Sequence, residues 1–131
     1  MTKKSRGYVA LVSVLVVSAV GLAVASSLLL LGLSYSKSSL ALSQSDIAKS
    51  LADACAEDAL QHIRDNTAYS GTATLNLNGD SCSSTVTSGI GQIRNINASG
   101  SKNGVVRKVK VSISAHTPQI IISSWQEVAD F

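Results

Sequence analysis

The chain has 131 residues, a net charge of +3, and a composition that is 45% apolar but only 4% aromatic. Three of the positive charges lie within the first seven residues, so the remainder is close to neutral and gives little indication of a nucleic-acid partner. If the first third is a membrane helix, roughly 80 to 90 residues remain, which is one small domain at most. With one Trp and one Phe, such a domain has a thin core that benefits from a covalent cross-link.

A continuous apolar run, residues 8–34, is the longest feature of the sequence and carries no charged side chain. A helix needs about 20 apolar residues to cross a bilayer. Because three basic residues precede the run, the positive-inside bias predicts a cytoplasmic N-terminus and export of everything after the run. We therefore expect residues 1–7 to be a targeting leader and residues 8–34 to be a transmembrane helix.

The sequence has two candidate cleavage sites, one within the apolar run and one directly before it. Ala23 and Ala25 fit the small-residue rule of an ordinary secretory signal, which would release a domain that begins at Ser26. However, the strongly apolar stretch LLLLGL follows from Leu28, and an ordinary signal would not place such a block behind its cut. The sequence favours retention of the whole run, with any cut made after Gly7.

The residues that follow the apolar run also have helical character. Ser34 to Asp65 contains no Pro and no Gly, and its apolar residues recur at helical spacing. These are Leu40, Ile47, Leu51, Ala54, Cys55, Leu60 and Ile63. We expect one continuous helix from about Tyr8 to about Asp65, apolar all round in its first half and amphipathic in its second half. Lys49 and Asp53 are expected to pair on its exposed side.

After Gly71 the apolar period changes to two, which predicts β-strands. Asn78-Gly79 and Asn103-Gly104 are signals for tight hairpin turns. The predicted strands cover residues 72–77, 81–87, 92–98 and 105–113, with a possible short fifth strand at 120–123. Within residues 92–98 the apolar side chains are out of phase, which predicts a bulge.

The predicted fold class is therefore α+β. A long N-terminal helix packs through residues 35–65 on a small antiparallel β-sheet of four or five strands within residues 72–124. The globular head comprises residues 35–131, and the preceding residues form the leader and the transmembrane helix.

The order of leader, glycine, apolar helix and small sheet, with Lys-Lys-Ser-Arg-Gly7 followed by Tyr8, resembles the type IV pilin superfamily, and more closely a minor pilin or pseudopilin. The resemblance implies that a prepilin peptidase cuts after Gly7 and methylates the new N-terminus at Tyr8. It also implies that Gly21 softens the helix. Val12 stands where the family usually has a glutamate, which indicates a minor subunit.

The resemblance also implies partners and a location. The chain would sit in the bacterial cytoplasmic membrane as a single-pass protein and then join other pilin subunits, through its apolar helix, in a cell-surface pilus or pseudopilus. Attachment, motility, DNA uptake and protein secretion stay open as the task of the filament. The rival interpretation is a signal-anchored or secreted small surface or binding domain that does not polymerise.

Cys55 and Cys82 both lie on the exported side of the apolar run. In an oxidising compartment an even pair of cysteines is most simply a disulfide. It would close a loop of about 28 residues and stabilise the head by roughly 3 to 3.5 kcal/mol in the chain-entropy model. Two buried free thiols, or a redox or metal site, are the alternatives.

Small residues in the apolar run are candidates for helix packing. Gly21 and Ala25 form a small-xxx-small step, and Ser18 precedes them. Such a step permits close approach of two helices. The alternative is that small residues are merely tolerated in lipid.

No catalytic, cofactor-binding or metal-binding constellation is predicted. The two histidines, His62 and His116, lack ligands at suitable spacing, and no G-x-S-x-G motif is present. We expect His62 to interact with the helix dipole. The sequence favours a structural protein over an enzyme and predicts no cofactor.

Two further features each have two interpretations. The one basic cluster beyond the leader comprises Arg94, Lys102, Arg107, Lys108 and Lys110. They suit either a DNA-binding surface or a solvated strand face, and the absence of interleaved aromatic residues favours the solvated face. Trp125, after the apolar triplet at 120–122, suits either a docking patch or a plug of the core, and we favour the plug.

Overall fold

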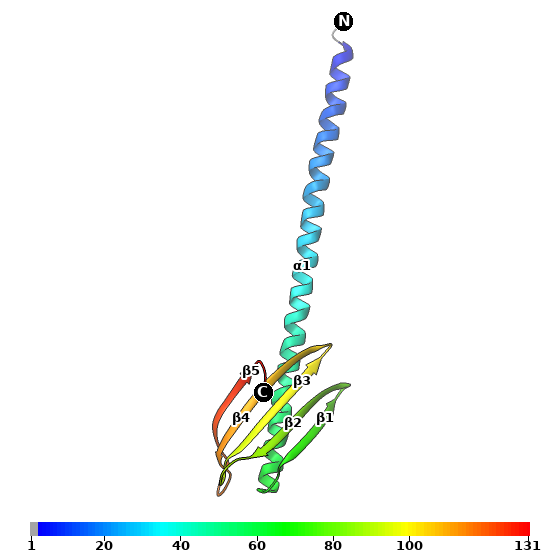
Figure 1. Ribbon diagram of the computed structural model, residues 1–131. Helices are drawn as coiled ribbons and strands as arrows, with labels where there is room; N and C mark the ends of the chain where they lie inside the picture. The colour runs from blue at the N-terminus through cyan, green and yellow to red at the C-terminus, as the bar shows by residue number, and fades with distance from the viewer. Residues whose placement is uncertain (1–2) are drawn as a thin grey trace. The chain divides into compact units, whose positions relative to one another are not determined.

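The computed structural model describes residues 3–131, with side chains from residue 7 onward. It has one long helix and a five-stranded antiparallel sheet, which confirms the predicted α+β class (Figure 1). The elements are α1 (Lys3–Asp65), β1 (Gly71–Leu77), β2 (Asp80–Ser88), β3 (Arg94–Lys102), β4 (Val105–Ala115) and β5 (Ile121–Val128). Residues 41–131 form one compact unit, called the head below, and the residues up to Leu40 form the other.

Helix α1 is 63 residues long and ends as predicted. It begins at Lys3 and not near Tyr8, because the basic leader contains no proline to stop a helix. At the other end, the Asn66 amide donates to the carbonyl of His62 at 2.9 Å, and the Asn66 side chain accepts from the amide of Ala68 at 3.0 Å. The first bond satisfies a carbonyl that the last turn leaves free, and the second closes a turn that redirects the chain toward β1.

The five strands form a meander in which each strand pairs with the next along the chain. Two of the connections are the predicted two-residue turns, Asn78-Gly79 and Asn103-Gly104. All four residues have positive φ values, between 48° and 86°. Two successive positive φ values define the hairpin turn that matches the twist of antiparallel strands, and Asn-Gly adopts it most readily.

The third and fifth strands differ from the prediction. β3 starts two residues later than predicted, ends four residues later and pairs regularly with both neighbours. The out-of-phase Ile93 lies before the strand, in a turn where its carbonyl accepts from the amide of Gly89 at 2.8 Å. The irregularities occur instead between β4 and β5, at 112–115. β5 is eight residues long and not four.

The core of the head lies between α1 and the inner face of the sheet. The helix contributes small side chains at nearly every turn, and the three central strands contribute branched ones. The buried residues include Ala48, Ala52, Cys55, Ala56, Ala59, Ile63, Val86, Ile96, Ala98, Val109, Val111 and Ile113. Alanines at a spacing of three or four lie on one face of a helix, so α1 can approach the sheet closely.

The helix and the sheet approach each other very closely at Gly100 in β3. A Cβ atom built there would lie 2.2 Å from the carbonyl oxygen of Ala48 and 2.6 Å from the amide nitrogen of Ala52. Both are backbone atoms of α1, so no side chain could rotate away to make room. The helix and the sheet therefore meet almost backbone to backbone at this point.

The predicted disulfide is present. Cys55 of α1 and Cys82 of β2 are bonded, with their Cα atoms 6.0 Å apart, and both are almost fully buried. Cys82, Ser84 and Val86 share the inner face of β2, as the alternation predicted. The bond joins the helix to the sheet across the core.

Helix α1 is tied to β5 by polar contacts that were not predicted. The Trp125 indole donates to Asp53 at 3.1 Å, and Lys49 lies 3.6 Å from Glu127. Glu127 also pairs with Arg107 at 2.9 Å. The expected pairing of Lys49 with Asp53 is therefore replaced by contacts of both residues with β5.

Trp125 does not plug the core, and that prediction was wrong. Its side chain is 39% exposed and covers the edge of the helix–sheet interface. The small alanines of α1 bring the helix so close to the sheet that no space for an indole is left between them.

We predict that Gly100→Ala destabilises the head by about 1 to 3 kcal/mol, because the added methyl group would overlap the helix backbone. The check is the denaturation midpoint of the full chain in detergent, followed by circular dichroism. Ser101→Ala, at the next position on the opposite face of β3, is the matched control and should have little effect. Equal midpoints for Gly100→Ala and the unchanged chain would contradict the close helix–sheet contact.

We further predict that reduction of the Cys55–Cys82 bond lowers the free energy of unfolding by about 3 to 3.5 kcal/mol, since it releases a long loop in the unfolded chain. Denaturant titrations with and without reductant measure this difference. A Cys55→Ala/Cys82→Ala double variant should be insensitive to reductant, which controls for other effects of the reagent.

Candidate functional site

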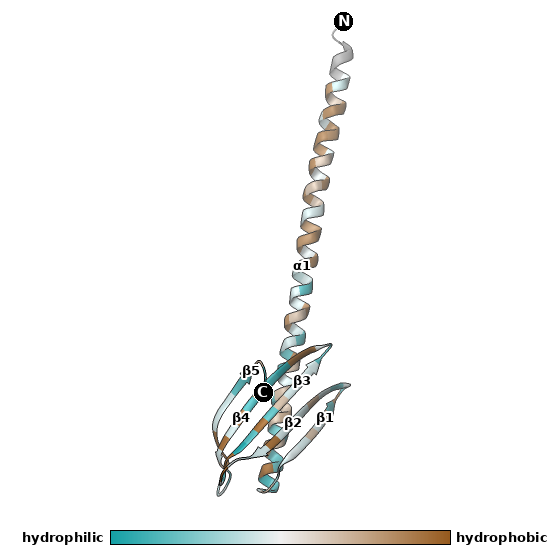
Figure 2. Cartoon of the chain, viewed as in Figure 1, coloured by the Kyte–Doolittle hydropathy of each residue, from teal (hydrophilic) through white to brown (hydrophobic). Residues whose placement is uncertain are grey.

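The candidate site is the apolar segment of α1, residues 8–34. Every side chain in it is exposed, and the helix from Gly7 is long and apolar enough to span a membrane, with a mean hydropathy of 2.6 in its most apolar window (Figure 2). Single exposed apolar side chains are ordinary on proteins, but a continuous apolar surface of this size marks contact with lipid or with another protein.

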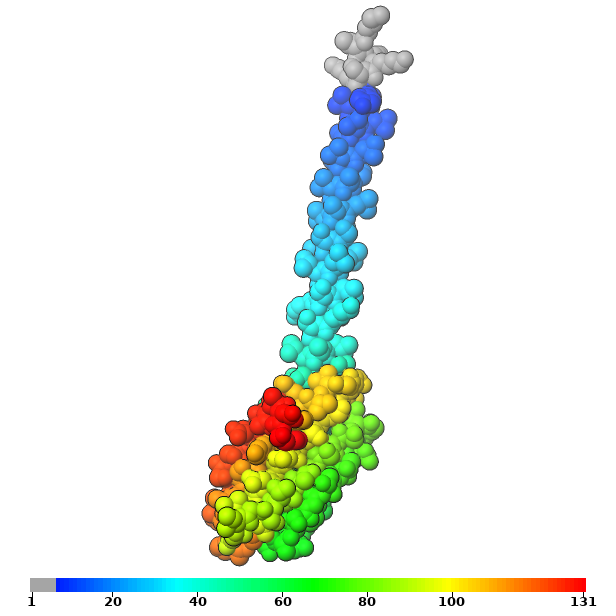
Figure 3. Space-filling view, viewed as in Figure 1, coloured from blue at the N-terminus to red at the C-terminus, as the bar shows by residue number. Residues whose placement is uncertain are grey.

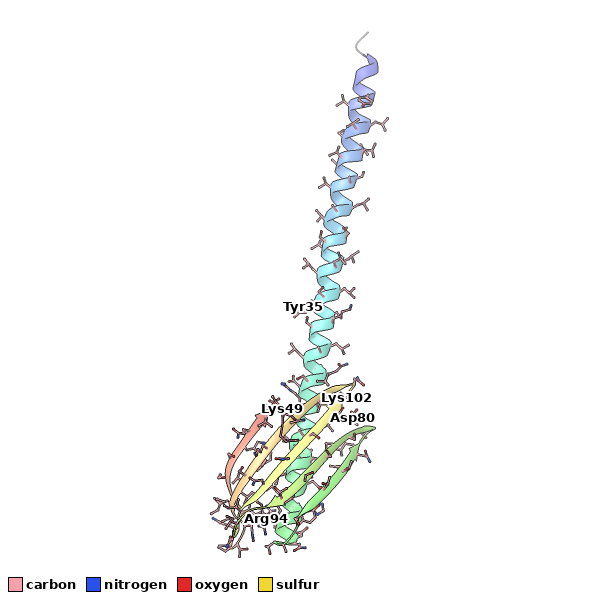
Figure 4. The ribbon with its side chains drawn as sticks, viewed as in Figure 1. Tyr35, Lys49, Asp80, Arg94 and Lys102 are labelled. Atoms are coloured by element: carbon pink, nitrogen blue, oxygen red, sulfur yellow. A yellow bond between two sulfur atoms is a disulfide. The ribbon has the colours of Figure 1, made fainter. Side chains whose placement is uncertain are left out.

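Tyrosines bracket this segment. Tyr8 is 72% exposed and Tyr35, labelled in Figure 4, is 80% exposed. They are separated by 27 residues, which corresponds to about 40 Å of helix at 1.5 Å per residue. A bilayer including its polar interfaces is about 40 to 45 Å thick, and tyrosines concentrate at those interfaces. This signal is present in the sequence, since Tyr35 directly follows the predicted segment 8–34.

Several serines of the segment donate hydrogen bonds to their own helix, among them Ser18, Ser26 and Ser27. Ser18 donates to the carbonyl of Val14 at 2.6 Å, and Ser26 and Ser27 both donate to the carbonyl of Ala23, at 2.9 and 2.8 Å. A hydroxyl that bonds its own backbone can lie in an apolar environment without losing a hydrogen bond. The serines therefore need no polar partner outside the helix.

The predicted packing residues Ser18, Gly21 and Ala25 share one face of the helix, since they are separated by three and four positions. A Cβ atom added at Gly21 would meet nothing within 4 Å. The face is therefore open, and its packing against another helix stays a prediction.

The predicted processing junction, Gly7–Tyr8, lies within the helix that begins at Lys3. A Cβ atom at Gly7 would also meet nothing within 4 Å. The junction is therefore not covered by other described residues. The side chains of residues 1–6, which include the basic residues of the leader, lie outside the described part of the chain.

The basic residues beyond the leader do not form one patch. Arg107 faces the inner side of the sheet and pairs with Glu127, whereas Lys108 faces the outer side and pairs with Asp130. Lys102 pairs with Asp80 at 2.7 Å across the ends of two hairpins (Figure 4). Lys102, Arg107 and Lys108 each have an acidic partner, which offsets their positive charge.

The Asp130 carboxylate has a lowered pKa. The hydrogen bond from Lys108 is the main cause, and the hydrogen bond from the backbone amide of Phe131 adds to it. Both interactions favour the ionised form of the carboxylate.

Arg94 is buried, contrary to the expectation of a solvated face. Its guanidinium donates to the carbonyls of Ile93 at 2.9 Å and Thr67 at 3.0 Å, with a longer contact to the carbonyl of Gly91 at 3.4 Å. These carbonyls belong to the loops before β1 and before β3. Arg94 therefore holds two loops together at one end of the head, which is a structural role (Figure 4).

The two histidines have different neighbours in the head. His62 lies 3.3 Å from Asp58 and stacks on Tyr69, and His116 contacts Thr117 at 3.0 Å. His116 lines an open pocket of about 520 Å³ together with Arg64 and the loop at 117–120, which sequence reasoning had missed. In the part of the chain that the structure describes, no three His, Cys, Asp or Glu residues group closely enough to hold a metal ion.

The features of the candidate site are thus an exposed apolar helix segment, an open glycine junction before it and a disulfide-linked head after it. Comparisons with protein-family models, with curated proteins and with solved structures give no match to this chain.

Proposed function

We propose that this chain is a pilin-like structural subunit that is anchored in the bacterial cytoplasmic membrane and then assembled into a type IV pilus or pseudopilus. The observation that carries the proposal is that α1 has two different halves. Residues 8–34 are apolar and exposed on every side, whereas residues 48–63 form the spine of the head core. A single helix thus supplies both an apolar surface that needs partners and the support of a displayed domain.

The proposed route has three steps. The apolar segment first inserts in the membrane with the basic leader on the cytoplasmic side. A prepilin peptidase then cuts between Gly7 and Tyr8. The apolar segments of several subunits finally pack together, with the face of Gly21 and Ala25 allowing close approach.

Residue 12 is a valine where pilins usually have a glutamate, and this supports a minor subunit. A charged side chain inside the apolar segment would be costly in lipid unless a partner amine neutralised it. Val12 carries no such cost, and equally it offers no group that would pair with the N-terminus of a neighbouring subunit. The proposed role is structural and not enzymatic, and it involves no cofactor.

The second candidate is a signal-anchored or secreted surface domain that does not polymerise. The small residues at Ala23 and Ala25 are the observation in its favour, since they fit a secretory cleavage site before Ser26.

We predict that the mature protein, produced in cells that contain a prepilin peptidase, begins at Tyr8, with or without one added methyl group. Gly7→Leu should keep the leader, because the residue before the cut would no longer fit the peptidase. Gly32→Leu leaves the leader and the apolar run intact and is the control. Intact mass and N-terminal sequencing distinguish these products.

The other possible starts decide between the alternatives. A start at Ser26 would support the secreted domain. An uncut chain in both the unchanged protein and Gly32→Leu would indicate a plain membrane anchor and would refute processing as a prepilin.

A further inference from the structure

Strand β1 is an open and unprotected edge of the sheet. Within the described residues it pairs only with β2, at the edge opposite β5 (Figure 1). Its sequence, GTATLNL, contains no charge and no proline, and all seven residues pair with β2 in regular register. Proteins usually protect such edges with charges, prolines or bulges, because free backbone groups invite another strand.

The opposite edge has the protection that β1 lacks. Two register irregularities lie between β4 and β5, and Pro118 precedes β5. Glu127 places a charge on β5 and holds both Arg107 and Lys49. The two edges of one sheet are therefore unequal, and of the two edge strands only β1 is regularly paired and uncharged.

The turn after β1 defines which backbone groups face the open edge. Leu77 and Asp80 flank a two-residue turn, so they exchange backbone hydrogen bonds, and the hydrogen-bonded pairs then alternate along the strand. Consequently the amides and carbonyls of Thr72, Thr74 and Asn76 point away from β2. The side chains of these three residues are also exposed on the outer face of the sheet, which Figure 3 views.

The sequence of β1 is complementary to itself when two copies run antiparallel about Thr74. Thr72 then lies opposite Asn76 of the second copy, and Ala73 lies opposite the second copy's Leu75. Every opposed pair matches polar with polar on the outer face and apolar with apolar on the inner face, with small residues opposite large ones. The three edge-facing residues of each copy would form about six backbone hydrogen bonds.

Other registers are less favourable. A shift by one residue would place threonine opposite leucine on both faces. Pairing centred on Ala73 or Leu75, or on Thr72 or Asn76, keeps the hydrogen-bond pattern and the faces but overlaps fewer residues of the strand. Centring on Thr74 uses the whole strand and places Leu77, which is 40% exposed, opposite Gly71 of the second copy, where there is room for it.

We infer that the β1 edge is a self-pairing surface, on which β1 of a second copy adds antiparallel about Thr74 and joins two heads into one continuous sheet. The two-fold axis is perpendicular to the sheet, so helix residues 41–65 of the two heads run in opposite directions on the same face. Because these residues belong to the continuous helix α1, two chains paired in this way cannot also lie side by side in one membrane or one filament. The pairing is therefore inferred for chains that are not neighbours in such an assembly, and it does not rest on the proposed function.

The test is site-specific cross-linking of the full chain in detergent, where copies can orient freely. Thr74→Cys should form a reducible dimer under mild oxidation, because opposed residues of a hydrogen-bonded pair have Cα atoms about 5.5 Å apart. Thr72→Cys is the matched control. Its two copies would be four residues apart along the strand, about 13 Å, which is beyond the reach of a disulfide.

A mixture of Thr72→Cys and Asn76→Cys chains gives an independent check of the register. It should form a cross-linked heterodimer, whereas neither chain alone should form a dimer. Thermal unfolding of each variant, matched to that of the unchanged chain, shows that the head remains folded.

Three results would overturn the inference. These are the absence of a dimer for Thr74→Cys, equal cross-linking at Thr72 and Thr74, and the absence of the mixed heterodimer. Equal cross-linking would show that the apolar helices bring the heads into random contact in the micelle.

Discussion

The fold of the head depends on the close contact between helix α1 and strand β3. At Gly100 the two backbones are so near that even a methyl group would overlap the helix. The alanines at 48, 52, 56 and 59 make this approach possible along the helix. A closely packed core made of small side chains gains much of its stability from many short contacts, because each side chain buries little area.

The remaining features of the head follow from that short separation. Trp125 is too large for the interface and lies at its edge, where its indole bonds to Asp53. The charges of Lys49, Arg107 and Glu127 gather at the same edge, since the core has no room for them. The disulfide between Cys55 and Cys82 holds the helix and sheet together where large apolar side chains are few.

Much of this architecture could be predicted from local patterns. The period of two along β2 and β4, the Asn-Gly turns and the even pair of cysteines each indicate their structure without knowledge of the fold. The start of β3 could not be predicted in this way, because Ile93 belongs to a turn although it has the composition of a strand. The partners of Arg94 and Lys49 could not be predicted either, since they come from segments distant in the sequence. For the candidate site, the sequence identifies the apolar segment completely but contains no direct information on which surface covers it.

The hydrogen bonds of the serines in α1 have a consequence for the energetics of the apolar segment. Because Ser18, Ser26 and Ser27 are bonded to their own helix, moving the segment from one apolar environment to another breaks no hydrogen bond. The difference in free energy between two such environments then arises mainly from van der Waals packing and is small for each residue. A helix of this kind can exchange one apolar medium for another with little net change in free energy.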